Sequence, residues 1–480
     1  FYGGTIYRFK VENKQGVPVA GAKVRWQIAS TIKSAEERAA AMPETQTDEN
    51  GLASLPFKVT GNSDAAKSMR RLNFMSNQAI ILRIEHSDHP PVLHNLASVD
   101  QDAITLPEAT TIEIRAVDEH NKPLSRLYPD YHAQQRDWSE KEGVLTLRNV
   151  DLSSHSRAWR LRILQIPEAG PALYSDLIEL KEQSGNTIKM DATLRPGVRV
   201  EGKLDAQVPR PVKGGQVVGI ACSEKLGSVW QATADIAADG TFVFESLPAE
   251  KHLQVVAVCD GWTSKKPAIA ELEQYGKEHP VVTKNFAEEL QHQSNWMQLH
   301  CLQSPSTELN VPMERAAACE VTVLDRHERP IPGVAVAFLP GWYNFWRGVI
   351  TVGYERDRLA DIRQELTTGQ PPKPLTKLAG PFIATTNDKG VAIVTTLPAT
   401  GDAQLRITMF QVLAEEYSAV GEYSLDPIRG NLEMLMSPPL TAGQTAKRTV
   451  YMRKDSDPPP PPADPDSFPL KENPFSAVAD

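Results

Sequence analysis

The residue types that best suit metal binding stand close together between positions 83 and 94. This stretch, RIEHSDHPPVLH, contains three histidines and two acidic residues: Glu85, His86, Asp88, His89 and His94. Side chains on one face of a strand recur at every second residue, whereas His86 and His89 are three residues apart. Pro90-Pro91 also redirects the chain after the strand. We therefore interpret this group as polar residues at a strand end and predict no metal site.

Acidic turns suggest calcium as another ligand. Three of them stand out: Asp48-Glu49-Asn50, Asp118-Glu119 and Asn387-Asp388. Calcium takes six to eight oxygen ligands, and none of these turns has the alternating aspartates and distal glutamate of a calcium loop. Aspartate and asparagine are also typical of tight turns, which explains the pattern without an ion. Calcium bound between folded modules stays open as an alternative.

Sequence motifs for catalysis are missing from the chain. It has no G-x-S-x-G segment, no H-E-x-x-H pair and no glycine-rich phosphate loop. An enzyme would need a polar cleft in which side chains from distant positions converge. We therefore predict no catalytic residues and no cofactor, and we do not expect an enzyme.

The four cysteines could form disulfides. They are Cys222, Cys259, Cys301 and Cys319, and no two have the C-x-x-C spacing of a zinc or redox motif. Cys222 and Cys259 lie in two strand-like runs of one region, while Cys301 ends a further run and Cys319 begins the next region. We expect the pairings 222–259 and 301–319 in an oxidising compartment. The alternative is four buried thiols that act as small hydrophobic side chains.

An aromatic segment is the most unusual local feature. It combines four large aromatic residues with an arginine: Trp342, Tyr343, Phe345, Trp346 and Arg347. Tryptophan, tyrosine and arginine dominate the strongest contacts of protein interfaces. One interpretation is an exposed patch that contacts a protein or stacks on sugar rings. The other is a loop that packs over a neighbouring helix and seals one end of a β-sandwich.

Composition narrows the class of protein. The 480 residues have room for roughly three or four domains. A net charge of −9 gives no electrostatic argument for binding nucleic acid or an anionic membrane. No apolar run approaches the roughly 20 residues of a membrane helix, so we expect no membrane span. The chain begins at Phe1, and we expect a signal peptide or an N-terminal anchor to precede it.

A repeated phrase predicts the architecture. Residues 321–338 read VTVLDRHERPIPGVAVAF, in which two alternating apolar runs flank a turn with proline and glycine. Alternation predicts half-buried strands, and proline and glycine are typical of the connection. Residues 9–26 repeat the phrase as FKVENKQGVPVAGAKVRW, and residues 114–127 carry a shorter version, IRAVDEHNKPLSRL. The repetition indicates a chain of β-modules.

A second signature follows the first phrase in three of the regions. It reads TDENGLA at 47–53, ADGTF at 238–242 and TNDKGVA at 386–392, and each copy continues to a Leu-Pro pair. Together the two phrases resemble the carboxypeptidase regulatory-like, or transthyretin-like, β-sandwich modules, which are similar to other bacterial immunoglobulin-like modules. The resemblance covers residues 5–95, 198–262 and 320–410, and only weakly 110–190. It implies β-sandwich folds and non-catalytic extracytoplasmic roles in surface display, adhesion or assembly.

The expected organisation is four β-sandwich modules and a tail. The modules are predicted at 1–104, 105–194 (the most degenerate copy), 195–315 and 316–453, with short helices at 31–41 and 355–366 and a polar helical connection at 267–296. The tail, 454–480, contains the proline run 458–462, which is typical of an extended spacer. After this run, three separate apolar residues suit a linear docking segment: Phe468, Leu470 and Phe475. The alternative is a plain disordered end.

The predicted protein is therefore all-β: tandem immunoglobulin-like or transthyretin-like sandwiches with short helical insertions and a proline-rich tail. We expect a non-catalytic extracytoplasmic protein, periplasmic, secreted or on the cell surface, whose modules and tail bind protein partners in a larger assembly. The alternative function is carbohydrate binding through residues 342–346. Neither function requires a cofactor or nucleic acid.

Overall fold

The structure is a computed structural model in which residues 5–454 are described, apart from several internal stretches. The stretches outside the description are 28–43, 58–80, 96–102, 132–136, 153–158, 169, 181–186, 224–228, 280–296, 304, 340, 345–347, 352–356, 371–381, 400–408, 414–416 and 421–433. The helix expected at 31–41 and the tail from residue 455 onward lie outside the described residues.

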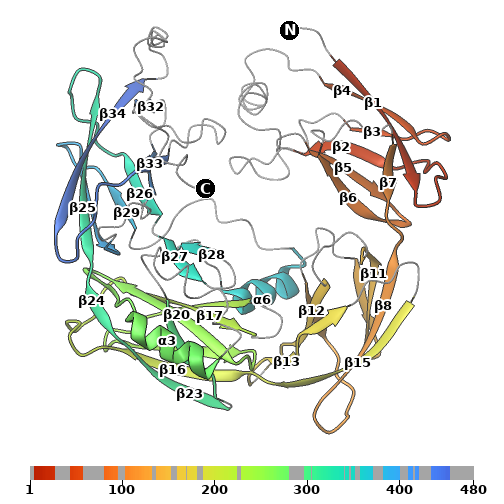
Figure 1. Ribbon diagram of the computed structural model, residues 1–480, viewed down its shortest axis with the longest axis horizontal. Helices are drawn as coiled ribbons and strands as arrows, with labels where there is room; N and C mark the ends of the chain where they lie inside the picture. Colours follow the sequence, from red (N-terminus) through yellow and green to blue (C-terminus); the bar gives the residue numbers. More distant parts are fainter. Residues whose placement is uncertain are drawn as a thin grey trace.

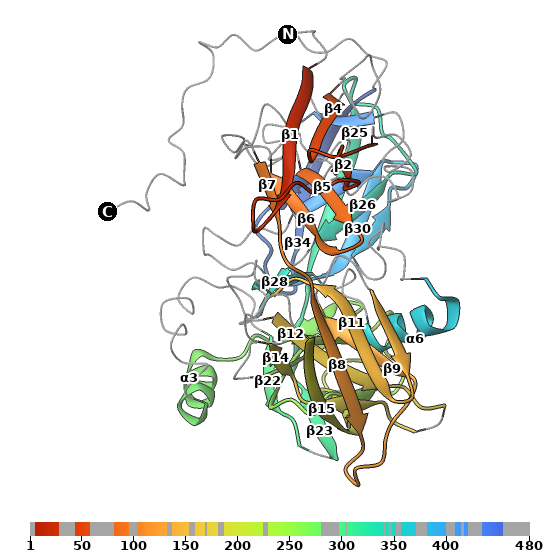
Figure 2. The same ribbon diagram turned by 90° about the vertical axis from the view of Figure 1, so that its right-hand side faces the viewer.

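Strand pairing divides the described chain into four groups, called modules 1 to 4 here. Figure 1 shows the modules following one another around an arc, with modules 1 and 4 at its two ends. In Figure 2, modules 1 and 4 occupy the upper part of the molecule and modules 2 and 3 the lower part. The expected all-β class of tandem sandwiches is confirmed.

Module 1 consists of two small sheets. One has the order β4 (Leu52–Phe57), β1 (Thr5–Asn13) and β7 (Ala103–Leu106), and the other has β3 (Glu44–Gln46), β2 (Lys23–Gln27), β5 (Ile81–His86) and β6 (His89–Asn95). Their facing apolar side chains, among them Val11, Leu55 and Ile84, form one core.

Module 2 folds its two layers from one continuous sheet. The first layer is β10 (Trp138–Lys141), β11 (Val144–Val150), β8 (Thr110–Val117) and β15 (Thr187–Pro196). The second is β13 (Leu173–Ser175), β12 (Trp159–Gln165), β14 (Ile178–Leu180) and β9 (Leu127–Tyr131). Strand β15 joins them, because its first part pairs with β8 and its last residues pair with β13.

Module 3 has the largest second sheet. Its first sheet is β19 (Thr241–Leu247), β16 (Val198–Leu204) and β23 (Ser306–Val311). The second is β18 (Val229–Asp235), β17 (Gln216–Cys222), β20 (His252–Cys259), β21 (Trp262–Ser264) and β24 (Met313–Arg315), with β22 (Gln298–Cys301) also paired to β20. Helix α3 (Ile269–Glu278) begins the connection that the sequence predicted to be helical.

Module 4 repeats this plan with a hairpin and a helix inserted. Its sheets are β30 (Val391–Leu397), β25 (Ala317–Asp325), β34 (Thr445–Lys454) and β32 (Tyr417–Val420), facing β29 (Ile383–Thr385), β26 (Ala335–Leu339), β31 (Met409–Leu413) and β33 (Met434–Met436). The insertions are the hairpin β27 (Gly341–Asn344) and β28 (Gly348–Thr351) and helix α6 (Arg358–Thr368). The Asp357 carboxylate accepts from the Ala360 amide, and the helix ends at Gly369 in the left-handed conformation.

The first strands of the four modules share one pattern of pairing. Each pairs antiparallel with one strand of its module and parallel with a later one. The parallel partner is the last strand in modules 1, 2 and 4, whereas in module 3 it is β23, which β24 follows. Only Gly197 separates β15 from β16. Short connections of this kind leave neighbouring modules little freedom to separate.

The first turn of the repeated phrase is held by one side chain in modules 1, 2 and 4. The side-chain oxygen of Asn13, Asp118 or Asp325 accepts from the amides two and four residues later, at 2.8–3.0 Å. The backbone amide of Lys122 thereby lowers the pKa of Asp118. These residues form turns by their own hydrogen bonds, as their positions in the sequence indicated.

The threonine that begins the second signature in modules 1 and 4 bonds to the backbone that follows the first turn. The Thr47 hydroxyl accepts from the Ala22 amide at 2.8 Å and donates to the Val19 carbonyl at 2.7 Å. In module 4 the Thr386 hydroxyl makes the equivalent bonds to Val334 and Ile331. Four buried or half-buried backbone groups are satisfied by these two hydroxyls, which explains why a threonine begins the signature.

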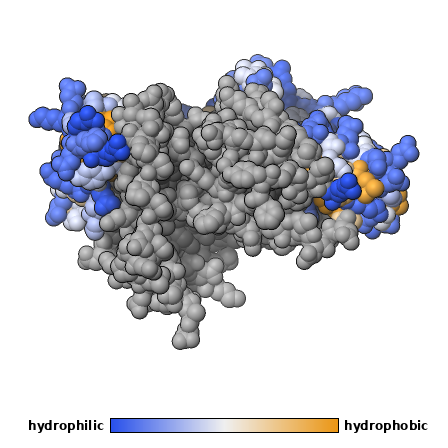
Figure 3. Space-filling view, turned by 90° about the horizontal axis from the view of Figure 1, so that it is seen from above, coloured by the Kyte–Doolittle hydropathy of each residue, from blue (hydrophilic) through white to orange (hydrophobic). Residues whose placement is uncertain are grey.

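Exposed apolar side chains are few and dispersed in the described part of the chain. The large ones are Val17, Leu52, Ile269, Leu366, Ile393 and Tyr451, which belong to modules 1, 3 and 4. Seen from above, the described residues on both flanks are mainly hydrophilic with small apolar spots (Figure 3). No helix among the described residues is long and apolar enough to cross a membrane.

Two glycines of module 4 both have a positive φ, but only one of them is also crowded by neighbouring backbone atoms. Gly333 has φ +73° and open space where a Cβ would lie, whereas Gly390 has φ +70° and its Cβ would lie 2.5 Å from the Val323 carbonyl oxygen. Gly333→Ala should therefore cost only the strain of the left-handed conformation, about 1–2 kcal/mol. Gly390→Ala should cost about 1–3 kcal/mol more because the backbone must also move. Urea denaturation of both variants checks this order, and equal losses would contradict it.

Candidate functional site

The aromatic segment and the tail are only partly described. Trp342 and Tyr343 lie on β27, opposite Ile350 and Val349 of β28. Phe345, Trp346 and Arg347 lie outside the described residues, and so do Phe468, Leu470 and Phe475 of the tail. Their contact roles therefore stay predictions.

The histidines near residue 90 lie on the β5–β6 hairpin. His86 and His89 are paired across it, with ring centroids 5.4 Å apart. Backbone groups engage both rings: His86 Nδ1 accepts from the Asp88 amide at 3.2 Å, and His89 Nδ1 lies 2.9 Å from the Pro107 carbonyl oxygen. His94 lies further along β6, where burial lowers its pKa. The three rings thus lie on the β5–β6 strand pair. Pro90-Pro91, which we expected to redirect the chain after the strand, lie within β6.

The four cysteines are free thiols, so the expected disulfides are not formed. Strand register explains why 222 and 259 do not meet. Cys222 of β17 lies opposite His252 at the start of β20, while Cys259 stands at the far end of β20. Cys301 of β22 also lies opposite His252, on the other side of β20. Cys319 is buried in module 4. The two expected pairings assumed neighbours that the register does not provide.

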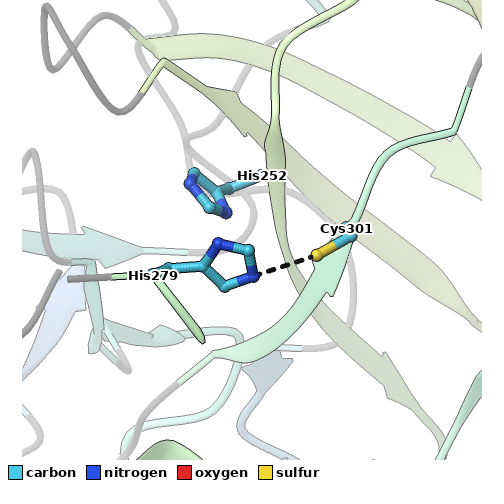
Figure 4. A group of neighbouring side chains, drawn as sticks. All are labelled: His252, His279 and Cys301. Carbon is cyan, nitrogen blue, oxygen red and sulfur yellow. Dashed lines mark hydrogen bonds between the residues drawn. The ribbon is translucent and has the colours of Figure 1, made fainter. Parts of the chain in front are cut away.

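A cluster of two imidazoles and one thiol, the His–Cys cluster, forms around His252 (Figure 4). His252 is fully buried on β20, His279 follows the last turn of α3, and Cys301 is exposed at the end of β22. One ligand atom from each residue lies within 4.8 Å of the others. His279 Nε2 is 3.4 Å from Cys301 Sγ, which is within hydrogen-bond distance for sulfur.

Tyr275 of α3 supports this cluster. Its hydroxyl lies 2.6 Å from His252 Nδ1 and 3.6 Å from Cys301 Sγ. The rings of Tyr275 and His279 are 4.6 Å apart, and those of His252 and His279 are 4.9 Å apart. Neutral imidazoles and a thiolate are ligands for zinc and copper, and a thiol beside an imidazole is also the usual arrangement of a reactive cysteine.

Sequence reasoning did not find the His–Cys cluster because its members have no local spacing. The three residues are spread over positions 252 to 301 and belong to two strands and a helix end. Only the pairing of β22 with β20 brings Cys301 opposite His252. A motif such as C-x-x-C or a pair of nearby histidines is a local signal and does not detect such an arrangement.

Strands β17 and β20 are buried on both faces. On one face Val217, Ala221 and Val255 belong to the core of module 3. On the other face Val218 and Val256 belong to a second core that continues into module 4. The unbroken apolar runs QVVGIAC and HLQVVAVC are the sequence signal for this two-sided burial.

Modules 2 and 3 share a core in the same manner. Gly197 lies so close to module 3 that a Cβ would be 2.2 Å from Ser246 Oγ. The Tyr174 hydroxyl donates to the Ser246 carbonyl at 2.9 Å, and its ring packs edge-on against Trp230. Arg162 is 3% exposed and forms an ion pair with Glu250. Burial lowers the pKa of Arg162 to about 10, so the guanidinium still carries its charge at neutral pH.

Helix α6 of module 4 reaches back to both preceding modules. Leu359 and Ile362 are buried in the core that modules 2 and 3 share. The Arg358 guanidinium pairs with the Asp130 carboxylate of module 2, where Nε lies 3.0 Å from Oδ1. The Tyr128 hydroxyl of module 2 donates to the Glu365 carboxylate at 2.8 Å. The helix therefore bridges three modules.

Among the described residues, modules 1 and 2 are joined by polar contacts. The Asn149 amide donates to the Ser87 carbonyl at 3.2 Å, and the Gln15 amide donates to Glu108 at 2.7 Å. The hydrophobic core of module 1 is separate from that of module 2 among the described residues.

Comparisons with known proteins add little. No family model matches the chain and no curated protein matches it, so the carboxypeptidase regulatory-like resemblance stays a likeness of motifs. Similar solved structures include the Bacillus anthracis TIE protein (11% identity, 94% of this chain and 75% of that chain, TM-score 0.17) and a streptococcal ancillary pilin (9%, 73% and 100%, TM-score 0.20). The minor pilin GBS52 of Streptococcus agalactiae has 9% identity, covers 55% of this chain and 99% of its own, and gives a TM-score of 0.22. TM-scores of this size show no shared overall arrangement, and no function is carried over.

The Arg358–Asp130 pair should couple module 4 to module 2. A double-mutant cycle with Arg358→Ala and Asp130→Ala should give a coupling energy of about 0.5–3 kcal/mol in urea unfolding, since the two charged groups contact each other directly. Arg363 is an exposed arginine of the same helix, and its cycle with Asp130 should give less than about 0.5 kcal/mol. Equal coupling in both cycles would contradict the bridging role of Arg358.

Thiol reactivity should distinguish Cys301 from the other cysteines. Burial raises the pKa of Cys259 and of Cys319 to about 11, so neither forms the reactive thiolate near neutral pH. A chromogenic disulfide reagent should react rapidly with one thiol of the native protein and with four after unfolding without reductant. The fast reaction should disappear in Cys301→Ala. A count of two after unfolding would instead indicate that a disulfide forms.

Proposed function

We propose that this chain is a non-catalytic structural protein of an extracytoplasmic assembly, in which the modules hold protein-binding surfaces at fixed relative positions. The observation that carries the proposal is the two-sided burial of β17 and β20, which makes the contact between modules 3 and 4 part of a hydrophobic core. Domains in one chain move relative to each other unless their interface is large and apolar. Modules 2 to 4 meet this condition.

The polar groups between the modules also fix how the modules are oriented relative to one another. Arg162 is paired with Glu250, Arg358 with Asp130, and Tyr174 with a backbone carbonyl. A buried ion pair gives little net stability, because both charges lose their hydration, but it fixes orientation when separation would leave a charge unpaired. Such contacts favour one arrangement of the modules, which suits a scaffold.

We assign binding of the protein partner to the tail. Its proline run 458–462 favours an extended spacer, and Phe468, Leu470 and Phe475 supply apolar contacts that a groove on another protein can bind. It directly follows β34, the strand that closes module 4. A docking segment there would begin from a fixed point of the scaffold.

Native purification with cross-linking tests the proposal. The tagged full chain, produced in its cells of origin, should co-purify with a partner that cross-links to residues 455–480. A chain ending at 454 keeps every described strand and should lose the partner. A chain whose last 26 residues are shuffled has the same length and composition, and it should lose the partner as well.

Variants of the aromatic segment test the alternative that the partner binds at residues 342–346 instead of the tail. Trp342→Ala combined with Trp346→Ala should leave the partner bound when the tail carries the contact. If the partner is lost in that variant and kept by the shuffled tail, the contact lies at 342–346. A monodisperse monomer in native extracts would contradict a structural role in an assembly.

A further inference from the structure

The proposed structural role does not use the His–Cys cluster. His252, His279 and Cys301 lie at the edge of module 3 formed by β22 and the end of α3, and the contacts between modules described above do not include them. Burial of an imidazole requires polar partners, and beside the buried His252 lie the Tyr275 hydroxyl, a second imidazole and an exposed thiol. Their chemistry indicates which ligand they suit.

We propose that these three residues form a binding site for a borderline-soft divalent metal ion, zinc or copper. Imidazole nitrogen and thiolate sulfur suit these ions, whereas magnesium and calcium prefer oxygen. Bond lengths of about 2.05 Å to nitrogen and 2.3 Å to sulfur place N and S about 3.6 Å apart around a tetrahedral ion. The observed 3.4 Å between His279 Nε2 and Cys301 Sγ is close to that separation.

The ligand His252 is oriented for such a site. Its Nδ1 is held by the Tyr275 hydroxyl at 2.6 Å, so we assign Nε2 to the ion. Metal-binding histidines commonly engage their second nitrogen with a neighbouring oxygen, which fixes the ring and its tautomer. Tyr275 is thus a positioning residue. Binding would release the Cys301 thiol proton to solvent, because the thiolate is the ligand.

The site has three protein ligands and an open side. Cys301 is exposed, so a water molecule can complete a tetrahedral coordination from the solvent. The ion would connect β20, β22 and the C-terminal end of α3, which are already linked by side-chain contacts and by the β20–β22 pairing. Binding should therefore fasten the helix end to the sheet.

Metal titration of the full chain tests the proposal. Chelator-treated protein is dialysed separately against Zn²⁺ and Cu²⁺, bound metal is measured by elemental analysis, and competition with a chromogenic chelator gives each affinity. One equivalent of at least one of the two ions is expected. Co²⁺ should produce a thiolate-to-metal charge-transfer band that is absent in Cys301→Ala. The relative affinity for the two ions then identifies which one the site prefers.

Matched variants locate the site. Cys301→Ala and His279→Ala lie at its rim and should abolish stoichiometric binding while circular dichroism stays unchanged. Tyr275→Phe should weaken binding about 10- to 100-fold, as loss of a group that orients a metal ligand does. His120→Ala removes an exposed histidine of module 2 and should change nothing. Zn²⁺ or Cu²⁺ should also slow modification of the Cys301 thiol in the wild-type chain.

Three results would overturn the proposal: no equivalent of either ion in the wild type, equal binding in Cys301→Ala, or metal that does not protect the Cys301 thiol. His279 and Cys301 would then form only a hydrogen bond between an imidazole and a thiol. The structural role proposed above does not depend on this outcome, because the partner contact and the metal are measured separately.

Discussion

The central strands of module 3 have no face left for water, and the arrangement of modules 2 to 4 depends on that constraint. Successive residues of β17 and β20 alternate between the core of module 3 and the core that continues into module 4. Removing module 4 would expose Val218, Ile220, Val256 and Val258 together. Each buried aliphatic side chain of this kind contributes about 1.5–3 kcal/mol relative to exposure. Module 3 therefore requires its neighbour as part of its own core.

Polar contacts between the modules restrict the rotation that apolar burial leaves open. Apolar surfaces attract without direction, so they set the distance between modules but leave rotation open. Arg162 and Arg358 restrict rotation, because a planar guanidinium pairs with a carboxylate in few geometries. Both arginines have their partners on other modules. Module 1 has neither a shared core nor such a pair with module 2 among the described residues, and its junction is correspondingly the least constrained.

Local patterns predicted local structure well and long-range pairing poorly. The repeated phrase predicted turns at Asp118 and Asp325, and in the structure their side chains accept hydrogen bonds from the backbone of these turns. Alternation predicted half-buried strands, and β25 alternates between buried and half-buried residues. The disulfide 222–259 was expected from two neighbouring strands, but it required the register of β17 on β20. Register is set by which face is buried and by the connections, so strand patterns alone do not reveal it.

The same limit explains the His–Cys cluster, and it also shows how the cluster is built. His252 projects from the face of β20 that carries Val256 and Val258, because side chains two and four residues apart share a face. On that face Val256 and Val258 belong to the core that continues into module 4, whereas the buried ligand His252 is held by the Tyr275 hydroxyl. His279 and Cys301 come from a helix end and an exposed strand end, where smaller movements cost less. An ion binding there would therefore adjust the two outer ligands around a fixed inner one. Its effect would fall on α3 and β22, while β20 and the arrangement of the modules would stay as they are.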